Sequence, residues 1–274
     1  MAASENDSDP ELDQLRDLAL AVAGESATLL HEQRPARVTV AGTKSSATDV
    51  VTEMDRASEA LIVARVLAAR PADGVLGEEG SEREGSSRVR WVIDPLDGTV
   101  NYLYGLPSWA VSIGVERAGE AVVGVVAVPT LGETYLAVRG RGALLITAGG
   151  RRRLRVNDPV ALSRALVATG FGYQEQRRRA QAAVARELIP RVRDIRRAGA
   201  CATDLCHLAA GRLDAFYEIG PQPWDHVAGG LIAREAGART ALLPVPGEAD
   251  PLVVAAGPAL FDPLRDLLRE LHPH

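Results

Sequence analysis

The chain has 274 residues, of which 46% are hydrophobic and 24% charged, as expected for a globular protein of one large domain or two small ones. Its formal net charge of −5 at pH 7 argues against general binding to nucleic acids or anionic membranes, which favours a basic excess. Lys44 is the only lysine among the 31 basic residues, so we ask why a lysine is retained there.

The first ten residues are small and acidic and lack the basic start and apolar run of a signal peptide. We predict a disordered tail over residues 1–10 and a cytoplasmic location. No apolar run approaches the ~18 residues that span a bilayer. Cys201 and Cys206 lie five apart in a helical pattern, a spacing that does not suit a disulfide, so we expect two buried thiols.

The first half of the chain predicts helices followed by strands. Apolar residues at helical spacing indicate helices over 12–31 and 52–69, and Pro71 lies just beyond the second. Short strands over 74–77 and 89–93 lead into Glu78 and Asp94, with a polar loop at 81–87 between them. An antiparallel meander is predicted from three β-branched runs, which are 110–115, 121–128 and 134–138.

The second half alternates between strands and helices, which favours an α/β arrangement. We divide the chain near residues 151–159 into an N-terminal α+β half (11–155) and a C-terminal α/β half (156–274). The predicted strands of the C-terminal half are 166–169, 192–195, 216–219 and 252–255, and its predicted helices are 174–188, 200–210, 225–236 and 258–268.

The densest chemistry follows the strand at 89–93. Asp94 and Asp97 lie three apart where the chain turns, Gly98 permits close approach to the backbone, and Thr99 can cap the next helix and leave N–H groups for an anion. When this stretch is taken alone, a turn rich in Asp and Pro with a helix cap is the favoured explanation.

Two further acidic sites favour a metal centre. Glu78 and Glu79 also follow a strand, and Asp225 opens a helix, although a solvated loop and a helix cap remain alternatives for them. Carboxylates without a nearby His/Cys set suit Mg²⁺ or Mn²⁺, and paired hard cations serve phosphoryl hydrolysis. The sequence has no P-loop, and the Gly170-Phe-Gly172 pair lacks the third glycine of a dinucleotide motif.

These residues lie in blocks that resemble the inositol monophosphatase family of Mg²⁺-dependent, Li⁺-sensitive phosphomonoesterases, in the bacterial type. The resemblance covers about residues 12–268 and keeps the family's order. The matching blocks are Lys44–Asp55, Gly77–Glu79, Trp91–Tyr102, Arg197–Gly199, Asp204–Leu205, Ala209–Glu218 and Trp224–Gly237.

The resemblance implies a five-layered αβαβα sandwich and a homodimer, with two or three Mg²⁺ per site, or Mn²⁺ in their place. The substrate it implies is a small phosphorylated polyol, with no nucleic acid or membrane as partner. It implies that Glu78, Asp94 and the Leu96 carbonyl bind one metal and that Asp94, Asp97 and Asp225 bind another.

The remaining implied roles concern water and substrate. Thr99 paired with Asp55, together with Glu78, would orient the attacking water. The amides of Gly98 and Thr99 would hold the phosphate, and Glu218 matches the position that contacts inositol hydroxyls. Lys44 matches a loop near the metals, where we hypothesise that it helps to close the site over phosphate, since ammonium and guanidinium groups are not interchangeable there.

One departure from the family pattern bears on the substrate. The chain reads Gly199-Ala-Cys201-Ala where many members have a hydroxyl residue after the glycine, so that hydroxyl is lost, while the backbone at Cys201 can still contact the substrate ring. Inositol 1-phosphate is the favoured substrate, and histidinol phosphate or another sugar or nucleotide phosphate is the alternative. The arginines at 151–153 and 177–179 could serve a bisphosphate, although such runs are usually solvated. A regulatory binding protein is the alternative from another class.

Overall fold

The computed structural model describes residues 9–46 and 48–272, so most of the predicted tail lies outside the described residues. Of the residues that we assigned to the tail, Pro10 begins the first helix, α1 (Pro10–Glu32), and Asp9 is its N-cap. The Asp9 carboxylate accepts the N–H groups of Glu11 and Leu12, and Pro10 occupies the first turn, where no N–H is needed. The capping carboxylate therefore fixes the start of the helix before the predicted tail ends.

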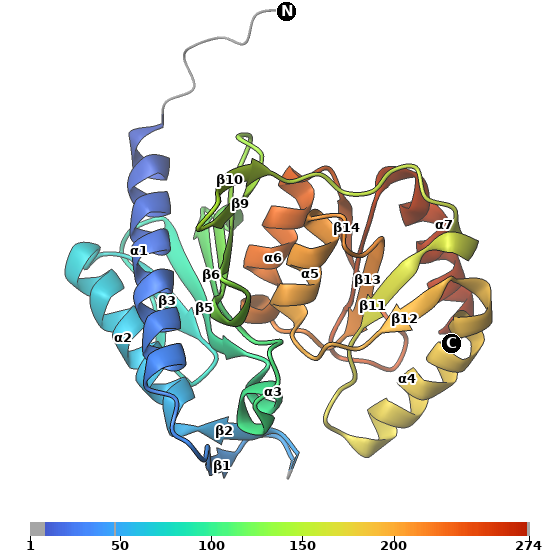
Figure 1. Ribbon diagram of the computed structural model, residues 1–274, viewed down its shortest axis with the longest axis horizontal. Coiled ribbons are helices and arrows are strands. Elements are labelled where there is room, and N and C mark those ends of the chain that lie inside the picture. Colours follow the sequence, from blue (N-terminus) through green and yellow to red (C-terminus); the bar gives the residue numbers. More distant parts are fainter. Residues whose placement is uncertain (1–8, 47, 273–274) are drawn as a thin grey trace, which may run out of the picture.

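The helices and sheets stack in five layers, α–β–α–β–α (Figure 1). Two helices cover the outer face of an eight-stranded sheet, two fill the space between this sheet and a five-stranded one, and two cover the far face (Figure 1). The pairs are α1 with α2 (Glu53–Ala69), α5 (Cys201–Ala209) with α6 (Pro223–Glu235), and α4 (Glu175–Leu188) with α7 (Pro258–Leu271). The predicted αβαβα sandwich is confirmed.

The eight-stranded sheet has the order β10-β9-β8-β7-β6-β5-β3-β4. Its strands are β3 (Gly74–Gly77), β4 (Glu82–Arg83), β5 (Val89–Asp97), β6 (Ala110–Arg117), β7 (Glu120–Val128), β8 (Glu133–Val138), β9 (Ala143–Thr147) and β10 (Gly150–Arg153). The predicted meander is present from β6 to β8, and β9 and β10 extend it. The segment that we predicted as a polar loop contains the strand β4, which is too short, at two residues, to show a strand pattern in the sequence. Because β3 and β5 are parallel neighbours, the loops after them leave the sheet at the same edge.

The five-stranded sheet has the order β12-β11-β13-β15-β14, and only β14 was not predicted. Its strands are β11 (Leu166–Thr169), β12 (Asp194–Arg196), β13 (Ala215–Ile219), β14 (Arg239–Leu243) and β15 (Leu252–Ala256). The boundary predicted near residue 155 falls in the connection between β10 and β11. Outside these two sheets, β1 (Val40–Thr43) and β2 (Val50–Thr52) form a small two-stranded sheet, and α3 (Thr99–Tyr104) is a short helix.

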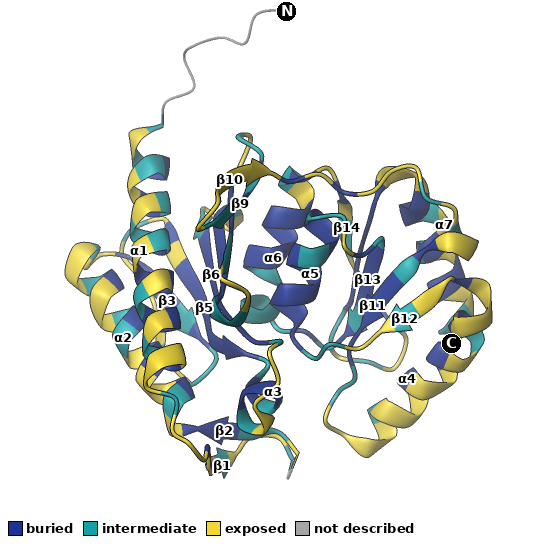
Figure 2. Ribbon diagram, viewed as in Figure 1, coloured by how far each residue is buried: buried dark blue, intermediate teal, exposed yellow. Residues whose placement is uncertain are grey.

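The middle layer is largely buried, as the mostly dark ribbons of α5 and α6 show, although residues 223–227 of α6 are half-buried and Arg234 is exposed (Figure 2). Glycines in the sheet let α6 lie close to it: a Cβ at Gly114 would lie 2.6 Å from Val227 Cγ1, and one at Gly124 would lie 2.7 Å from the Ala228 carbonyl. This close packing fixes α6, and with it Asp225, against the eight-stranded sheet. Cys201 and Cys206 are buried free thiols on α5, as predicted.

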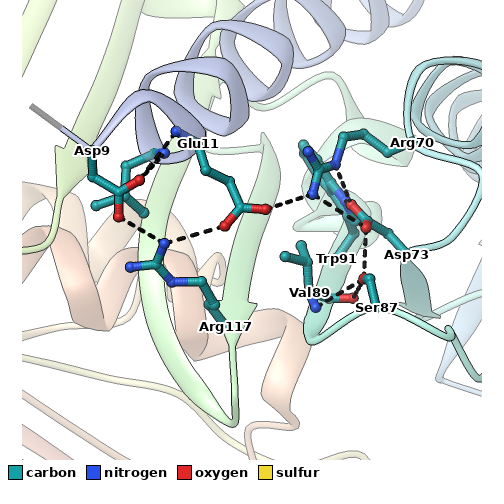
Figure 3. Close-up of polar contacts among 9 residues, drawn as sticks. Asp9, Glu11, Arg70, Asp73, Ser87, Val89, Trp91 and Arg117 are labelled. Carbon is teal, nitrogen blue, oxygen red and sulfur yellow. Dashed lines mark hydrogen bonds and ion pairs between the residues drawn. The ribbon is translucent and has the colours of Figure 1, made fainter.

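A buried carboxylate ties the first helix layer to the sheet (Figure 3). Asp73, only 1% exposed, accepts hydrogen bonds from Arg70 Nε at 2.8 Å, Ser87 Oγ at 2.7 Å and Trp91 Nε1 at 3.0 Å. Burial alone would raise the pKa of Asp73, but the hydrogen bonds from Arg70, Trp91 and Ser87 outweigh it and lower the pKa. Glu11 pairs with the same arginine, so the network continues to α1.

We expect Asp73→Ala to lower the free energy of unfolding by about 2–4 kcal/mol, because it leaves the buried Trp91 N–H and the Arg70 guanidinium without this acceptor. Urea unfolding measures the change. Asp17→Ala is the control, since Asp17 is exposed and forms an ion pair with its neighbour Arg16; it should cost about 0.5 kcal/mol or less. Equal losses in the two variants would contradict the role of Asp73.

Candidate active site

The predicted site residues converge on a pocket of about 400 Å³ at the junction of the two sheets. The pocket is lined from both halves of the chain by Lys44, Glu78, Asp94, Leu96, Asp97, Gly98, Thr99, Cys201, Glu218 and Asp225. Asp55 is fully buried and does not line the pocket, but its Oδ1 accepts the Thr99 hydroxyl at 2.9 Å. The structure thus brings together ten of the predicted site residues in one pocket, with Asp55 hydrogen-bonded to one of them.

The turn after β5 is shaped by Gly98. Its φ of +87° is left-handed, and a Cβ there would lie 2.8 Å from the Ser108 carbonyl, so the position favours glycine for both conformation and space. Gly98 is the N-cap of α3, which corrects our expectation that Thr99 caps this helix. Thr99 is its first residue, and its hydroxyl lies within hydrogen-bond distance of Asp55 and of the Leu96 carbonyl.

Asp97 joins this turn to the middle layer. Its Oδ1 accepts the N–H of Cys201 at 3.0 Å, and its Oδ2 accepts those of Ala202 at 2.9 Å and Thr203 at 3.3 Å. The carboxylate therefore satisfies the free N–H groups at the start of α5 and is favoured by the helix dipole. The Cys201 amide, which we expected to be available to substrate, is occupied by Asp97.

Asp225 and Glu218 approach the pocket from the other half of the chain. Asp225 is the third residue of α6, and its Oδ2 accepts the Gln222 N–H at 2.6 Å, which fixes the carboxylate at the helix start. Glu218 lies on β13, and its carboxylate occupies the space where a side chain at Gly170 would clash. Gly170 therefore leaves room for the Glu218 carboxylate, which we predicted to bind substrate.

Lys44 lies between the two glutamates that follow β3. Its Nζ donates to Glu78 Oε1 at 2.9 Å and to Glu79 Oε1 at 2.5 Å. Burial opposes the charge of the ammonium, but Glu78 and Glu79 outweigh this and raise the pKa of Lys44. Burial likewise raises the pKa of Glu79 to about 7, against the effect of Lys44. The lysine thus balances part of the acidic charge at this edge of the pocket.

The remaining carboxylates repel one another. Burial, then the charges of Glu78, Asp97 and Asp225, raise the pKa of Asp94 well above its ordinary value. Burial, then Glu78 and Asp97, do the same to the pKa of Asp225, and burial raises the pKa of Asp97 to about 8. Burial followed by Asp225 raises the pKa of Glu218 to about 8. The pocket therefore concentrates more negative charge than it stabilises by its own contacts.

The chemistry of this donor set fits a hard divalent cation, because every donor is an oxygen and the crowded carboxylates need positive charge. Across 9–46 and 48–272, no three or more His, Cys, Asp or Glu side chains stand in positions that would hold a metal ion as they are. Glu78 instead pairs with Lys44. Metal binding would therefore require side chains to turn toward a common point.

Some pocket residues were not predicted as site residues. Asp204, on α5, is 3% exposed, and burial, then Glu218, raise its pKa to about 8. Arg197 lines the pocket near both carboxylates and lowers their pKa values against these effects. Both residues lie in blocks of the family resemblance, which was the available signal. Arg177, from one of the arginine runs, also lines the pocket but pairs with Glu248 and Asp250, at 2.9 and 2.8 Å.

Comparisons with known proteins agree on the family. The family model described as "Inositol monophosphatase family" matches residues 11–256. Inositol-1-monophosphatase SuhB of Mycobacterium tuberculosis is 48% identical over 235 residues, which are 84% of this chain and 81% of that protein. A protein of Pseudomonas aeruginosa named Nus factor SuhB is 44% identical, over 71% of this chain and 72% of its own.

Solved structures give the same result. Mycobacterium tuberculosis SuhB superposes with a TM-score of 0.82 at 43% identity, covering 94% of this chain and 97% of that one. The IMPase of Thermotoga maritima superposes with a TM-score of 0.83 at 28% identity, covering 94% and 98%. No helix in the part of the chain that the structure describes has the length and apolar character needed to cross a bilayer. The chain belongs to the inositol monophosphatase family and is a phosphoric monoester hydrolase.

Proposed function

We propose that the chain hydrolyses inositol 1-phosphate to inositol and phosphate in a Mg²⁺-dependent reaction, by direct attack of water without a phospho-enzyme. The observation that carries this proposal is the gathering of Asp94, Asp97 and Asp225 in one pocket beside the Thr99–Asp55 pair. Repulsion among buried carboxylates favours cations, and cations are what an acidic pocket needs in order to accept a phosphate.

Two or three bound Mg²⁺ ions, or Mn²⁺ in their place, would lower the pKa of the attacking water and neutralise charge on the phosphate. Glu78, Asp94, Asp97, Asp225 and the Leu96 carbonyl would hold them. The ligand role is compatible with the present contacts, since a carboxylate has about four lone-pair sites and these carboxylates use only some of them.

The Thr99 hydroxyl has one proton, which goes to Asp55 or to the Leu96 carbonyl. Its oxygen lone pairs are then free to accept a proton of the attacking water, and Glu78 would hold the same water from the other side. Backbone N–H groups at Gly98 and Thr99 would donate to the phosphate oxygens as negative charge develops. Lys44 would close the loop over the phosphate, and unchanged turnover and metal affinity in Lys44→Arg would remove this role.

The test is a phosphatase assay with Mg²⁺, with and without Li⁺, on inositol 1-phosphate, histidinol phosphate, fructose 1,6-bisphosphate and adenosine 3′,5′-bisphosphate. Highest kcat/KM on inositol 1-phosphate supports the proposal. Preference for histidinol phosphate would favour the alternative substrate. The pairing of Arg177 with Glu248 and Asp250 leaves it a poor candidate for binding a second phosphate.

Glu218→Ala tests the assignment of the substrate more directly. We expect KM for inositol 1-phosphate to rise about tenfold, because hydrogen bonds from ring hydroxyls to the Glu218 carboxyl would be lost. The matched control is p-nitrophenyl phosphate, which has no ring hydroxyls and whose KM should stay the same. A rise of equal size for both substrates would contradict a role of Glu218 in recognising the polyol.

A regulatory binding role is the second candidate, since the Pseudomonas relative is named a Nus factor. A protein used only for binding has no need of a complete set of carboxylates, which favours the hydrolase. Capture of partners from a lysate by wild-type and Asp225→Asn protein, beside their turnover, separates the two roles. We also propose a homodimer in the cytoplasm, and light scattering on the purified chain would refute the dimer by returning the monomer mass.

A further inference from the structure

Helix α2 carries a face of three buried polar side chains, Asp55, Ser58 and Glu59. Their spacing of three and four residues places them on the same side of the helix. Polar groups in such a position are costly unless they are paired. Each of the three contacts a loop that carries candidate metal ligands, and only Asp55 has a role in the proposed reaction.

Glu59 holds the turn that follows β3. Its carboxylate is 3% exposed; Oε2 accepts the Glu79 N–H at 2.8 Å, and Oε1 accepts the Ser81 N–H at 2.9 Å. The turn is closed by Gly77 N–H, which donates to the Ser81 carbonyl at 2.7 Å. Glu78, a candidate metal ligand, is therefore held between residues whose backbone groups are fixed on both sides.

Gly77 provides the room for this carboxylate. A Cβ at this position would lie 2.5 Å from Glu59 Oε2 and 2.6 Å from Glu59 Cδ. The φ of Gly77 is outside the left-handed range, so glycine is needed here for space and not for backbone conformation. An alanine at 77 would thus displace the Glu59 carboxylate without straining the strand.

Ser58 reaches the second loop. Its Oγ donates to the Pro95 carbonyl at 2.9 Å, between the candidate ligands Asp94 and Leu96. Since the single Ser58 proton goes to Pro95, the contact of 2.6 Å with Ser26 Oγ must be donated by Ser26 on α1. One helix face therefore contacts the 94–99 turn through Asp55 and Ser58 and the 77–81 turn through Glu59.

We propose that Glu59, with Ser58, is a positioning residue for the metal centre and sets the distance between Glu78 and the turn that carries Asp94. The inference rests on the proposed function, because it assumes that both loops hold the same cations. Partners of metal ligands typically change metal affinity by about 10–100-fold when they are altered. Glu59 does not contact the Glu78 carboxylate itself and acts through the backbone of the turn that carries Glu78.

The test is calorimetric titration of metal-free protein with Mg²⁺, beside thermal unfolding without metal. Glu59→Gln keeps the side-chain volume but faces one N–H of the turn with its own NH₂ group. We expect it to raise the Kd for Mg²⁺ about tenfold or more, with kcat restored at saturating Mg²⁺. Gly77→Ala should act in the same direction, because it displaces the same carboxylate.

Glu25→Gln is the matched control, since Glu25 of α1 forms an exposed ion pair with Arg65 of α2, the helix that carries Glu59. The Kd of this variant for Mg²⁺ should stay within about twofold of the wild-type value. Glu78→Gln separates this inference from the proposed function. If wild type fails to bind Mg²⁺, or Glu78→Gln binds it normally, the proposed function fails. If Glu78→Gln weakens binding but Glu59→Gln and Gly77→Ala lower only the melting temperature, the positioning role is overturned.

Discussion

Asp94→Asn is expected to lower Mg²⁺-dependent turnover by about 10³-fold or more, since the proposed metals stabilise the transition state by several kcal/mol and each 1.4 kcal/mol is tenfold. Asp94 is the residue that we propose as a ligand of two metals. The fold should survive, because Asp94 Oδ1 accepts the Leu96 N–H at 2.9 Å and an asparagine oxygen can accept the same bond. Steady-state kinetics on inositol 1-phosphate measure the loss.

Circular dichroism and Mg²⁺ titration make the result specific. Asp94→Asn should melt at or above the temperature of metal-free wild type, because it removes one of several mutually repelling carboxylates. Asp262→Asn, an exposed carboxylate paired with Arg239 and Arg265, should keep full turnover. Retention of Mg²⁺-dependent turnover in Asp94→Asn would refute the assignment of the metal site.

Sequence patterns were most informative where the site is contiguous in the chain. The run from Asp94 to Thr99 and the start of α6 at Asp225 could be interpreted from residue types alone, and the structure places these segments at one pocket. The five layers followed from the family resemblance, while the alternation of strands and helices gave only the fold class. Periodicity works here because the long elements bury one face each.

Contacts between distant residues could not be predicted from the sequence. Asp97 accepts hydrogen bonds from three backbone N–H groups of α5 that lie 104 to 106 residues later in the chain, and no local pattern indicates that pairing. Glu59 has the spacing of an ordinary helical residue, and only its burial against the 77–81 turn reveals its partners. We predicted Thr99 as the helix cap because threonine is a common N-cap residue. The left-handed backbone that makes Gly98 the cap instead is not visible in the sequence.

Short strands were the other source of error. The two residues of β4 and the three of β2 pair because longer neighbours hold them, and they contain too few residues to show an alternating pattern. The arginines of β10 are exposed on an edge strand, where charged residues protect against further pairing. A run that looks like a solvated loop can therefore still be the last strand of a sheet.

Metal-free protein should lose thermal stability as the pH rises from about 6.5 to about 8. Burial raises the pKa of Asp97, Glu218 and Asp204 to about 8, whereas carboxyls in the unfolded chain titrate near about 4. Between these values the folded chain holds protons that the unfolded chain has released, so the free energy of unfolding falls as the pH rises.

The lower limit of this window is set by the histidines. Burial lowers the pKa of His226 to about 4 and also lowers that of His207. Below about pH 6.5 these histidines therefore make the free energy of unfolding rise with pH, which opposes the effect of the carboxyls. Above that pH these two histidines become neutral in the unfolded chain as well, and the carboxyls with raised pKa values determine the slope. The melting temperature in EDTA should therefore decrease steadily as the pH rises across this window.

Saturating Mg²⁺ should remove this fall, because cations that bind the folded chain replace the protons and stabilise it more at pH 8 than at about pH 6.5. Replacing Asp204 by Asn should flatten the slope in EDTA, since one group with a raised pKa is lost, whereas Asp262→Asn should leave it unchanged. A melting temperature that is independent of pH in EDTA, or a slope that Mg²⁺ does not alter, would contradict a pocket whose carboxylates exchange protons for metal.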